Sequence, residues 1–433
     1  MTSDTAATAH ASLGQDEGGA WAMQGSKYPG CWLSDSEPLS FDPLALRGKR
    51  LARVRAMLRD LDYAACVLFD PYNQRYATGS RNMFGYFLRN STRYIFVPAD
   101  GPVILFEYPG SAHVSTVLET IEGSRTSKLV WSSVLGKDAD TAVTFAAEIA
   151  DLVRSYGGGN RRVGLDRCGH NLAVALDQAG CQAVDCQQDL LHVRRIKTDE
   201  EIVCLKLSMA AAEGAVFSLR EAIRPGVAEQ ELFAILYEGI IRSGGEFIET
   251  RLLSSGPRTN PWFNEASGKK LRAGELVALD TDTIGCFGYY SDFSRSFHCG
   301  PGRPTGRQRD LYQRAYEQVQ HNISIIKRGM ALREVAERAW PIPERFLDRR
   351  YPSIIHGTGM HGEAPFIAHK MDYGDFGGED IIEPNMVLSI ESYIGEVGGT
   401  EGVKLEEEVL VTETGVELIS TFPFEEDLLG RAL

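Results

Sequence analysis

Three aspartates lie close together in the sequence, in a pattern that suits metal binding. Asp280 and Asp282 lie in a strand that we predict over residues 276–283. Because side chains alternate between the two faces of a strand, both carboxylates are expected to point the same way. A glycine-containing turn leads to a second predicted strand, residues 289–298, which brings Asp292 beside them. Carboxylates gathered in a protein core repel one another, so cations are expected to bind among them.

Three residues nearer the C-terminus complete the set of candidate ligands. His356 lies in a His-Gly-Thr-Gly sequence, and glycine lets the backbone pass close to a site. Glu391 lies in an apolar strand predicted over residues 385–393. Glu406 is the first of three consecutive glutamates in a strand predicted over residues 404–412, where one glutamate should point inward and two should be solvated. We therefore predict that a pair of divalent metal ions is held by six side chains: Asp280, Asp282, Asp292, His356, Glu391 and Glu406.

This set of ligand types restricts both the metal and the chemistry. Carboxylate oxygens with one imidazole suit Mn²⁺, Fe²⁺, Co²⁺ or Zn²⁺. Two such ions can activate a water molecule or bind a substrate carboxylate. The alternative is that these acids are ordinary surface residues in salt bridges. For Asp280 alone a further alternative is that it supports a ligand without binding metal itself.

The composition is that of a soluble, two-domain protein. The chain has 433 residues, which is too long for one ordinary core. A formal net charge of −14 repels phosphate backbones, so we expect no nucleic-acid partner. No apolar run is long enough for a membrane span, and the N-terminus lacks the features of a secretory signal. Eight cysteines without a Cys-x-x-Cys pair favour reduced thiols and a cytoplasmic location.

The periodicity of apolar residues divides the chain into three parts. Residues 1–44 are predicted to be a loosely packed N-terminal arm, residues 45–193 an α/β domain, and residues 194–433 an α+β domain with an antiparallel, curved sheet. Thr198 and Glu201 form a capping box that starts a helix. The predicted helices of the third part cover residues 199–223, 229–242, 305–326 and 332–346, the last kinked or divided by Pro341 and Pro343. Residues 94–97 and 103–106 are predicted to form a hairpin.

In its order of candidate ligands the chain resembles the pita-bread metalloenzymes, the family of methionine aminopeptidase, prolidase and creatinase. Members with metal carry Asp, Asp, His, Glu and Glu in that order, and by position these match Asp282, Asp292, His356, Glu391 and Glu406. The resemblance implies a pita-bread C-terminal domain preceded by a smaller creatinase-type α/β domain.

A closer resemblance is to the DddP-type dimethylsulfoniopropionate lyases. It rests on Asp280-Thr281-Asp282 and on further phrases along most of the chain, including Phe69-Asp70-Pro71, Ser255-Gly256-Pro257-Arg258, Asn260-Pro261-Trp262-Phe263 and Gly395-Glu396-Val397-Gly398-Gly399. It implies that Asp280 is also a metal ligand, that the two metals are iron, and that the protein is a homodimer. The first forty residues or so carry no such match.

Two departures from these families concern the catalytic groups. The peptidases carry a histidine before the first metal strand and another seven residues after the histidine ligand, where this chain has its Asn260–Phe263 stretch and Glu363. Peptidase activity is therefore not expected. The lyases carry a catalytic aspartate six residues after the histidine ligand, where this chain has Gly362. Glycine cannot accept a proton, so His361, Glu363 or another acid would have to act as the base.

The remaining candidates are aromatic. Tyr351 matches a tyrosine that assists the substrate in the lyases, although packing is its simpler role. Trp262 and Phe263 are candidates for an aromatic wall that binds a cationic, methylated head group, or for core residues.

Three functions follow, in order of preference. The first is β-elimination of a small zwitterionic carboxylate such as dimethylsulfoniopropionate to dimethyl sulfide and acrylate. The second is hydrolysis of a C–N bond in a small polar substrate. The third is a binding protein without catalytic activity, which the intact ligand set argues against.

Overall fold

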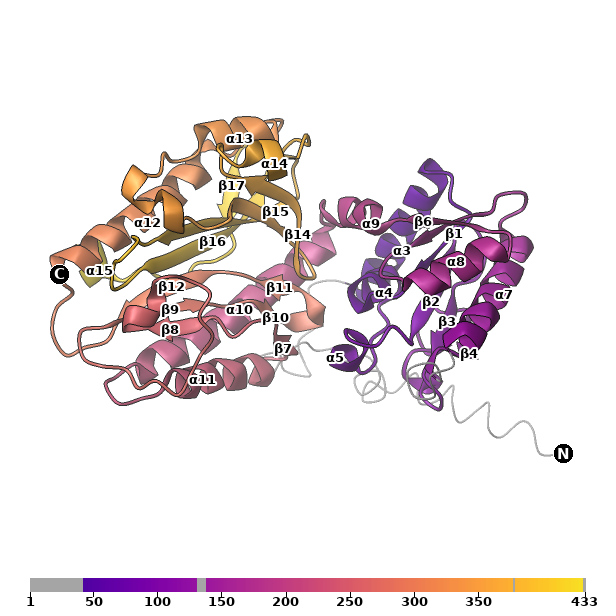
Figure 1. The fold of residues 1–433 in the computed structure, drawn as a ribbon, viewed down its shortest axis with the longest axis horizontal. Coiled ribbons are helices and arrows are strands. Elements are labelled where there is room, and N and C mark those ends of the chain that lie inside the picture. The colour runs from indigo at the N-terminus through magenta and orange to yellow at the C-terminus, as the bar shows by residue number, and fades with distance from the viewer. Residues whose placement is uncertain (1–41, 131–137, 377, 431–433) are drawn as a thin grey trace. The chain divides into compact units, whose positions relative to one another are not determined.

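The structure, a computed structural model, describes residues 42–130, 138–376 and 378–430. The chain forms two compact units that divide between Arg194 and Arg195. Figure 1 shows both units, each built of a sheet region covered by helices. The predicted N-terminal arm lies outside the described residues, apart from residues 42–44.

The N-terminal unit is a mixed six-stranded sheet with helices on both faces (Figure 1). Its strands run in the order β4-β3-β2-β1-β5-β6, and their bounds are β1 (Ala65–Leu68), β2 (Tyr94–Pro98), β3 (Ile104–Glu107), β4 (Gly123–Thr126), β5 (Arg162–Leu165) and β6 (Gln182–Asp185). Its helices are α3 (Pro43–Asp60), α4 (Pro71–Thr78), α5 (Phe84–Phe87), α7 (Asp138–Tyr156), α8 (His170–Gln178) and α9 (Gln187–Arg194). The predicted hairpin is confirmed, because β2 and β3 pair antiparallel.

The described strands of the C-terminal unit form three antiparallel sheets, with helices packed against them. Their orders are β11-β10-β7, β12-β9-β8 and β14-β13-β15-β16-β17. The strands are β7 (Phe247–Ile248), β8 (Leu253–Ser255), β9 (Leu276–Asp280), β10 (Thr283–Ile284), β11 (Tyr290–Ser291), β12 (Ser294–His298), β13 (Ser353–Thr358), β14 (Gly362–Ala368), β15 (Val387–Ile394), β16 (Val403–Val411) and β17 (Val416–Leu418). The helices are α10 (Asp199–Ala222), α11 (Glu229–Arg242), α12 (Gly306–Ile325), α13 (Leu332–Arg338), α14 (Tyr373–Phe376) and α15 (Glu426–Leu429).

The helices of the C-terminal unit follow from local signals in the sequence. The capping box is confirmed, because the Thr198 side chain accepts the N–H of Glu201 while the Glu201 carboxylate accepts that of Thr198. The helix predicted over residues 332–346 is interrupted, as expected from Pro341 and Pro343. Helix α13 ends at Arg338, and a 3₁₀ helix follows at Glu344–Arg349.

Both predicted strands that carry the aspartates are broken where the aspartates lie. The first ends at Asp280, and the chain resumes as β10 after Asp282, whose φ of 42° lies in the left-handed region. The second is interrupted at Asp292, between β11 and β12. The prediction of two continuous strands was therefore wrong, and the carboxylates meet because the backbone turns at them.

Strands β12 and β16 join two of the sheets through side chains. Among the described residues, no strand pairs with the first half of β16 on the edge opposite β15, because β17 pairs only with residues 409–411. Ser296 of β12 accepts the N–H of Lys404 and donates its hydroxyl to the carbonyl of the same residue. Arg295 donates to the carbonyl of Glu406. These bonds give hydrogen-bond partners to backbone groups of Lys404 and Glu406 on this edge. They also hold β9 and β12 against β16.

Helix α10 has the length and hydropathy of a membrane span, by those two criteria alone. Its buried residues, among them Leu205, Met209 and Val216, lie in the packed interior of the unit, where α10 contacts α11 and β11. We therefore regard it as a core helix. All seven described cysteines are free thiols.

Candidate metal centre

The six predicted ligands come from separate turns and strands of the C-terminal unit. Their side chains gather in one region between its sheets. Strand β9 carries Asp280, the connections after β9 and β11 carry Asp282 and Asp292, and β13, β15 and β16 carry His356, Glu391 and Glu406. Residues Glu391 and Glu406 are directly opposed across β15 and β16, so their side chains project from the same face. All five carboxylates are buried.

Two groups of ligand atoms share Asp292. One comprises Asp292, His356 and Glu406, and the other Asp280, Asp282 and Asp292. Within each group the ligand atoms lie within 4.8 Å of one another. A carboxylate common to both groups would be within reach of a metal ion held in either one.

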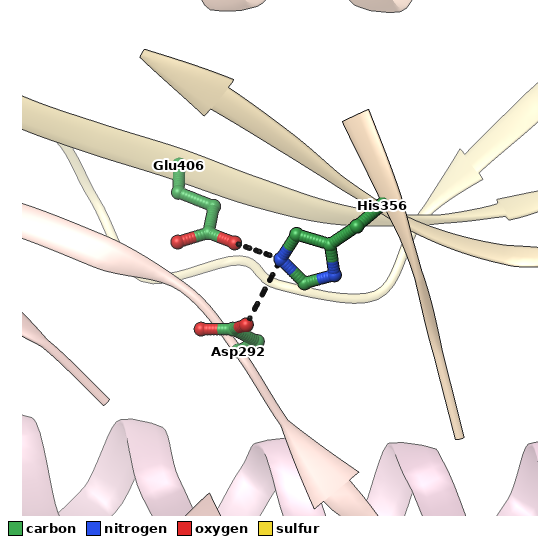
Figure 2. Close-up of side chains that lie close together, drawn as sticks. All are labelled: Asp292, His356 and Glu406. Atoms are coloured by element: carbon green, nitrogen blue, oxygen red, sulfur yellow. Dashed lines mark ion pairs between the residues drawn. The ribbon is translucent and has the colours of Figure 1, made fainter. Parts of the chain in front are cut away.

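The imidazole of His356 points into the first group (Figure 2). Its Nε2 lies 3.4 Å from Asp292 Oδ2, 3.5 Å from Glu391 Oε1 and 3.7 Å from Glu406 Oε1. Its Nδ1 lies 3.1 Å from the carbonyl oxygen of Gly357, which leaves Nε2 as the ligand atom. Burial by itself would lower the pKa of His356, but the carboxylates of Asp292 and Glu391 raise it well above its ordinary value.

The carboxylates are poorly satisfied without cations. Among the described residues, neither Asp292 Oδ1 nor Glu406 Oε1 has a hydrogen-bond partner, although both atoms are buried. Burial, followed by repulsion from Asp280, raises the pKa of Asp292 to about 7. Burial also raises the pKa of Asp282 and of Glu406 well above the ordinary range, and neighbouring carboxylates add to it. Orphaned, crowded oxygens with one imidazole fit divalent metal ions.

A lysine that the sequence analysis did not single out lies within the cluster. Lys404 is fully buried, and its Nζ lies 3.4 Å from Asp280 Oδ2 and 2.9 Å from Glu406 Oε2, and also contacts Glu391. Burial alone would raise the pKa of Asp280, but the Lys404 ammonium and the Ser294 hydroxyl hold it below its ordinary value. Lys404 and Glu406 are two residues apart on β16, so the alternation of the strand places them on one face and was the available signal.

Glu408 is the second residue of the site that was missed. We expected two of the three consecutive glutamates to be solvated, and this prediction was wrong because all three are buried. Glu407 pairs with Arg295, whereas Glu408 faces the site and accepts the N–H of Asp292 at 3.2 Å. Burial, followed by repulsion from Asp292, raises the pKa of Glu408 well above its ordinary value. A strand covered on both faces has no solvated side for glutamates.

Of the two candidate bases, His361 lies in the connection between β13 and β14, and Glu363 lies in β14. The Glu363 carboxylate is buried, accepts the N–H of Met360 at 2.9 Å and lies 4.0 Å from Lys197 Nζ. Those contacts tie it to the turn before β14. His361 is partly exposed, and its Nδ1 contacts the carbonyl oxygen of Gly362. A catalytic role for His361 or Glu363 stays a prediction.

The aromatic candidates adjoin the carboxylates through Tyr351. Lys404 Nζ lies 4.6 Å from the centroid of the Tyr351 ring. The Phe263 ring is 5.4 Å from that of Tyr351 and is 55% exposed, whereas Trp262 is buried against Tyr393. Burial, followed by the Glu391 charge, raises the pKa of Tyr351 well above its ordinary value. Phe263 is therefore the accessible member of this group, and Trp262 is mainly a packing residue.

Loss of the buried ammonium should destabilise the metal-free protein. We expect Lys404→Met to lower its free energy of unfolding by about 3–5 kcal/mol, because three buried carboxylates lose a charged partner. Divalent metal should restore most of this loss. Urea denaturation with chelator and with Mn²⁺ measures both quantities. Lys206→Met, which removes an exposed partner of Glu417, should change stability by less than about 1 kcal/mol. Equal stability of the two variants without metal would contradict the expectation.

The stability of the metal-free protein should fall as the pH rises. A carboxyl such as Asp292, whose pKa is raised on folding, keeps its proton in the folded state after the unfolded state has lost it. Its contribution is therefore lost as the pH rises from about 4 to about 7, and the raised pKa of His356 acts in the same direction. We expect the Tm of chelated protein to fall between about pH 5 and about pH 8, and that of metal-loaded protein to fall less. Scanning calorimetry measures both Tm values. If the Tm of the chelated and of the metal-loaded protein fell equally with pH, metal would not displace these protons.

Comparison with known proteins shows similarity along most of the chain. The family model for metallopeptidase family M24 matches residues 203–413, and that for the creatinase/prolidase N-terminal domain matches residues 50–196. A dimethylsulfoniopropionate lyase DddP from Roseovarius nubinhibens is 34% identical over 95% of this chain and 91% of its own length. Another, from Roseobacter denitrificans, is 32% identical over 90% of this chain and 88% of its own length. The Xaa-Pro dipeptidase from Bacillus anthracis superposes with a TM-score of 0.71 at 22% identity, over 88% of this chain and 99% of that one.

Proposed function

Because the chain belongs to metallopeptidase family M24, with a creatinase/prolidase N-terminal domain and whole-length similarity to DddP lyases, we propose that it is a dinuclear metal-dependent lyase. Its proposed reaction is β-elimination of a small zwitterionic carboxylate such as dimethylsulfoniopropionate. The observation that carries the proposal is that two relatives matching nearly the whole chain are lyases of this substrate. The same membership bears out the expected pita-bread fold.

The proposed metal ligands are the six residues described above. Asp292 would be shared between the two ions, since it belongs to both groups of ligand atoms. Divalent ions held there, with iron expected by resemblance, would act as Lewis acids on the substrate carboxylate and make its α-proton more acidic. His356 must be neutral at Nε2 to bind metal, so its raised pKa implies that loading releases a proton.

The elimination itself requires a base and a leaving group. A base removes one proton from the α-carbon, and the electron pair of that C–H bond becomes the second bond between the α- and β-carbons. The β-carbon–sulfur bond breaks, both of its electrons leave with neutral dimethyl sulfide, and acrylate remains. Gly362 cannot supply the base, so we assign that role to His361, Glu363 or another acid near the site. Phe263 and Tyr351, whose ring centroids lie 5.4 Å apart, would form part of the wall of the substrate site.

Release of dimethyl sulfide tests this function. Protein loaded with Fe²⁺ or Mn²⁺ is incubated with dimethylsulfoniopropionate, and the headspace is analysed by gas chromatography. We expect dimethyl sulfide and acrylate in equal amounts, and none above background from chelated protein. A loaded protein that releases no more than the chelated control would count against the proposal.

A second candidate is a metal-dependent hydrolase that cleaves a C–N bond of a small polar substrate. Gly362 favours it, because hydrolysis needs no side chain to remove a proton from carbon. The fold neighbours include an Xaa-Pro dipeptidase, although neither peptidase histidine is present in this sequence. A panel of amides and cyclic amidines, assayed with the same metal-loaded protein, decides between the two. Inactivity on the whole panel would leave the lyase as the proposed function.

A further inference from the structure

Access to the metal centre is on the side of His356. The side chain of His356 is 17% exposed, whereas those of Asp292, Glu391 and Glu406 are at most 4% exposed. The carboxylates are thus closed off by the protein, and the imidazole is the ligand that solvent can reach. A substrate that binds at this centre must lie against the residues that border that imidazole.

The neighbour of His356 on its open side is strand β14, the edge strand of the five-stranded sheet. Residues that face each other in an antiparallel pair project from the same side, with Cβ atoms about 4.5–5.5 Å apart. Phe366 is the residue opposite His356, so its side chain projects from the same face of the sheet. Phe366 is nevertheless 43% exposed. An aromatic side chain next to a metal ligand is therefore open to a bound molecule.

The same face of β14 leaves space next to that ring. Gly362 pairs with Thr358, which places it on the side of the sheet that carries His356. A Cβ atom added at Gly362 would lie 3.9 Å from His356 Cε1 and 3.9 Å from Nδ1, with no other heavy atom of the described chain within 4 Å. The imidazole edge thus borders open space at Gly362, and Phe366 projects from the face that carries His356.

We propose that Phe366 determines specificity by binding the methylated onium group of the substrate while the carboxylate end lies at the metal centre. This inference rests on the proposed function and names the residue that recognises the charged head. Aromatic faces bind sulfonium and quaternary ammonium groups, and in this unit the Tyr351 ring lies against the Lys404 ammonium.

The test compares two carboxylates of the same shape that differ in charge. One probe is 3-(trimethylammonio)propanoate and the other is its neutral isostere 4,4-dimethylpentanoate, and both are titrated calorimetrically into metal-loaded full-length protein. We expect the wild type to bind the cationic probe about tenfold more tightly than the neutral one. Phe366→Leu should bind the two probes equally, and Phe366→Trp should keep the preference. Phe217→Leu, at an exposed aromatic residue of α10, is the matched control and should behave as wild type.

The outcomes separate this inference from the proposed function. A preference for the cationic probe that survives in Phe366→Leu, or that is absent in the wild type, overturns the inference. If the preference depends on Phe366 but dimethyl sulfide is never released, the assignment of Phe366 stands and the lyase reaction fails. Metal content and Tm, measured for every variant, show that a lost preference does not come from a damaged fold or an empty centre.

Discussion

Asp292→Asn is expected to abolish both metal binding and catalysis while leaving the protein folded. Asp292 is the residue common to the two groups of ligand atoms, so a neutral amide weakens both at once. The same change removes a charge that is repelled by Asp280 in the metal-free state, where the pKa of Asp292 is about 7. The metal-free variant should therefore be as stable as the wild type or more stable. Elemental analysis, the dimethyl sulfide assay and chemical denaturation give the three quantities.

The control for this variant is Asp427→Asn, at an exposed position of α15. It should keep the metal content and the activity of the wild type. An Asp292→Asn protein that binds as much metal as the wild type would contradict a shared role for this carboxylate. A variant that unfolds even in the absence of metal would show that Asp292 is needed for the fold and not only for cations.

Gly362→Asp is expected to raise the rate of dimethyl sulfide release by about 10²–10⁴-fold, the usual contribution of a general base. The backbone at Gly362 tolerates a side chain, because its φ lies outside the left-handed region and an added Cβ meets only the edge of His356, at 3.9 Å. An aspartate there would extend from the open side of the imidazole towards the substrate. The initial rate with saturating dimethylsulfoniopropionate, at matched metal content, measures the gain.

Gly362→Asn distinguishes the effect of a proton acceptor at position 362 from the effect of a larger side chain there. It has the same size as the aspartate but cannot accept a proton at neutral pH, so its rate should not exceed that of the wild type. Equal rates for the two variants would mean that position 362 does not face the α-carbon. A wild-type rate already near that of Gly362→Asp would mean that another residue, such as His361 or Glu363, removes the proton efficiently.

The grouping of the six candidate ligands could be predicted from sequence because their types and order are unusual, but the course of their backbone could not. Alternation along a strand was the reason for placing Asp280 and Asp282 together, yet the strand ends at Asp280 and Asp282 adopts a left-handed conformation. Such a conformation costs free energy, which favourable contacts elsewhere in the fold must offset. Local sequence patterns do not reveal those contacts.

The elements that hold the site were predictable where the signals are local. The capping box at Thr198 and the proline break after α13 depend on neighbouring residues only, and both agree with the structure. Strand β13 and its partner β14 were not predicted, although they carry His356 and Phe366. Their residues do not show a clear alternation, and the pair contains register shifts, so its existence depends on the rest of the sheet.

The buried charges were the least predictable part of the site. Lys404, Glu406 and Glu408 alternate on one face of β16, a pattern that in sequence resembles a solvated strand face. They are buried because β9, β12 and α12 cover this strand, which is a property of the tertiary structure. Composition alone gives no reason to place a lysine among carboxylates that are expected to bind metal.

Metal content is the most direct test of the account. Purified full-length protein is loaded with Mn²⁺ or Fe²⁺, freed of excess metal, and analysed by inductively coupled plasma mass spectrometry beside His356→Ala and Asp292→Asn. We predict a pair of ions in each wild-type chain and a loss of metal in both variants. Wild-type protein without bound metal after loading, or variants that retain the full amount, would contradict the assignment of these residues as a metal centre.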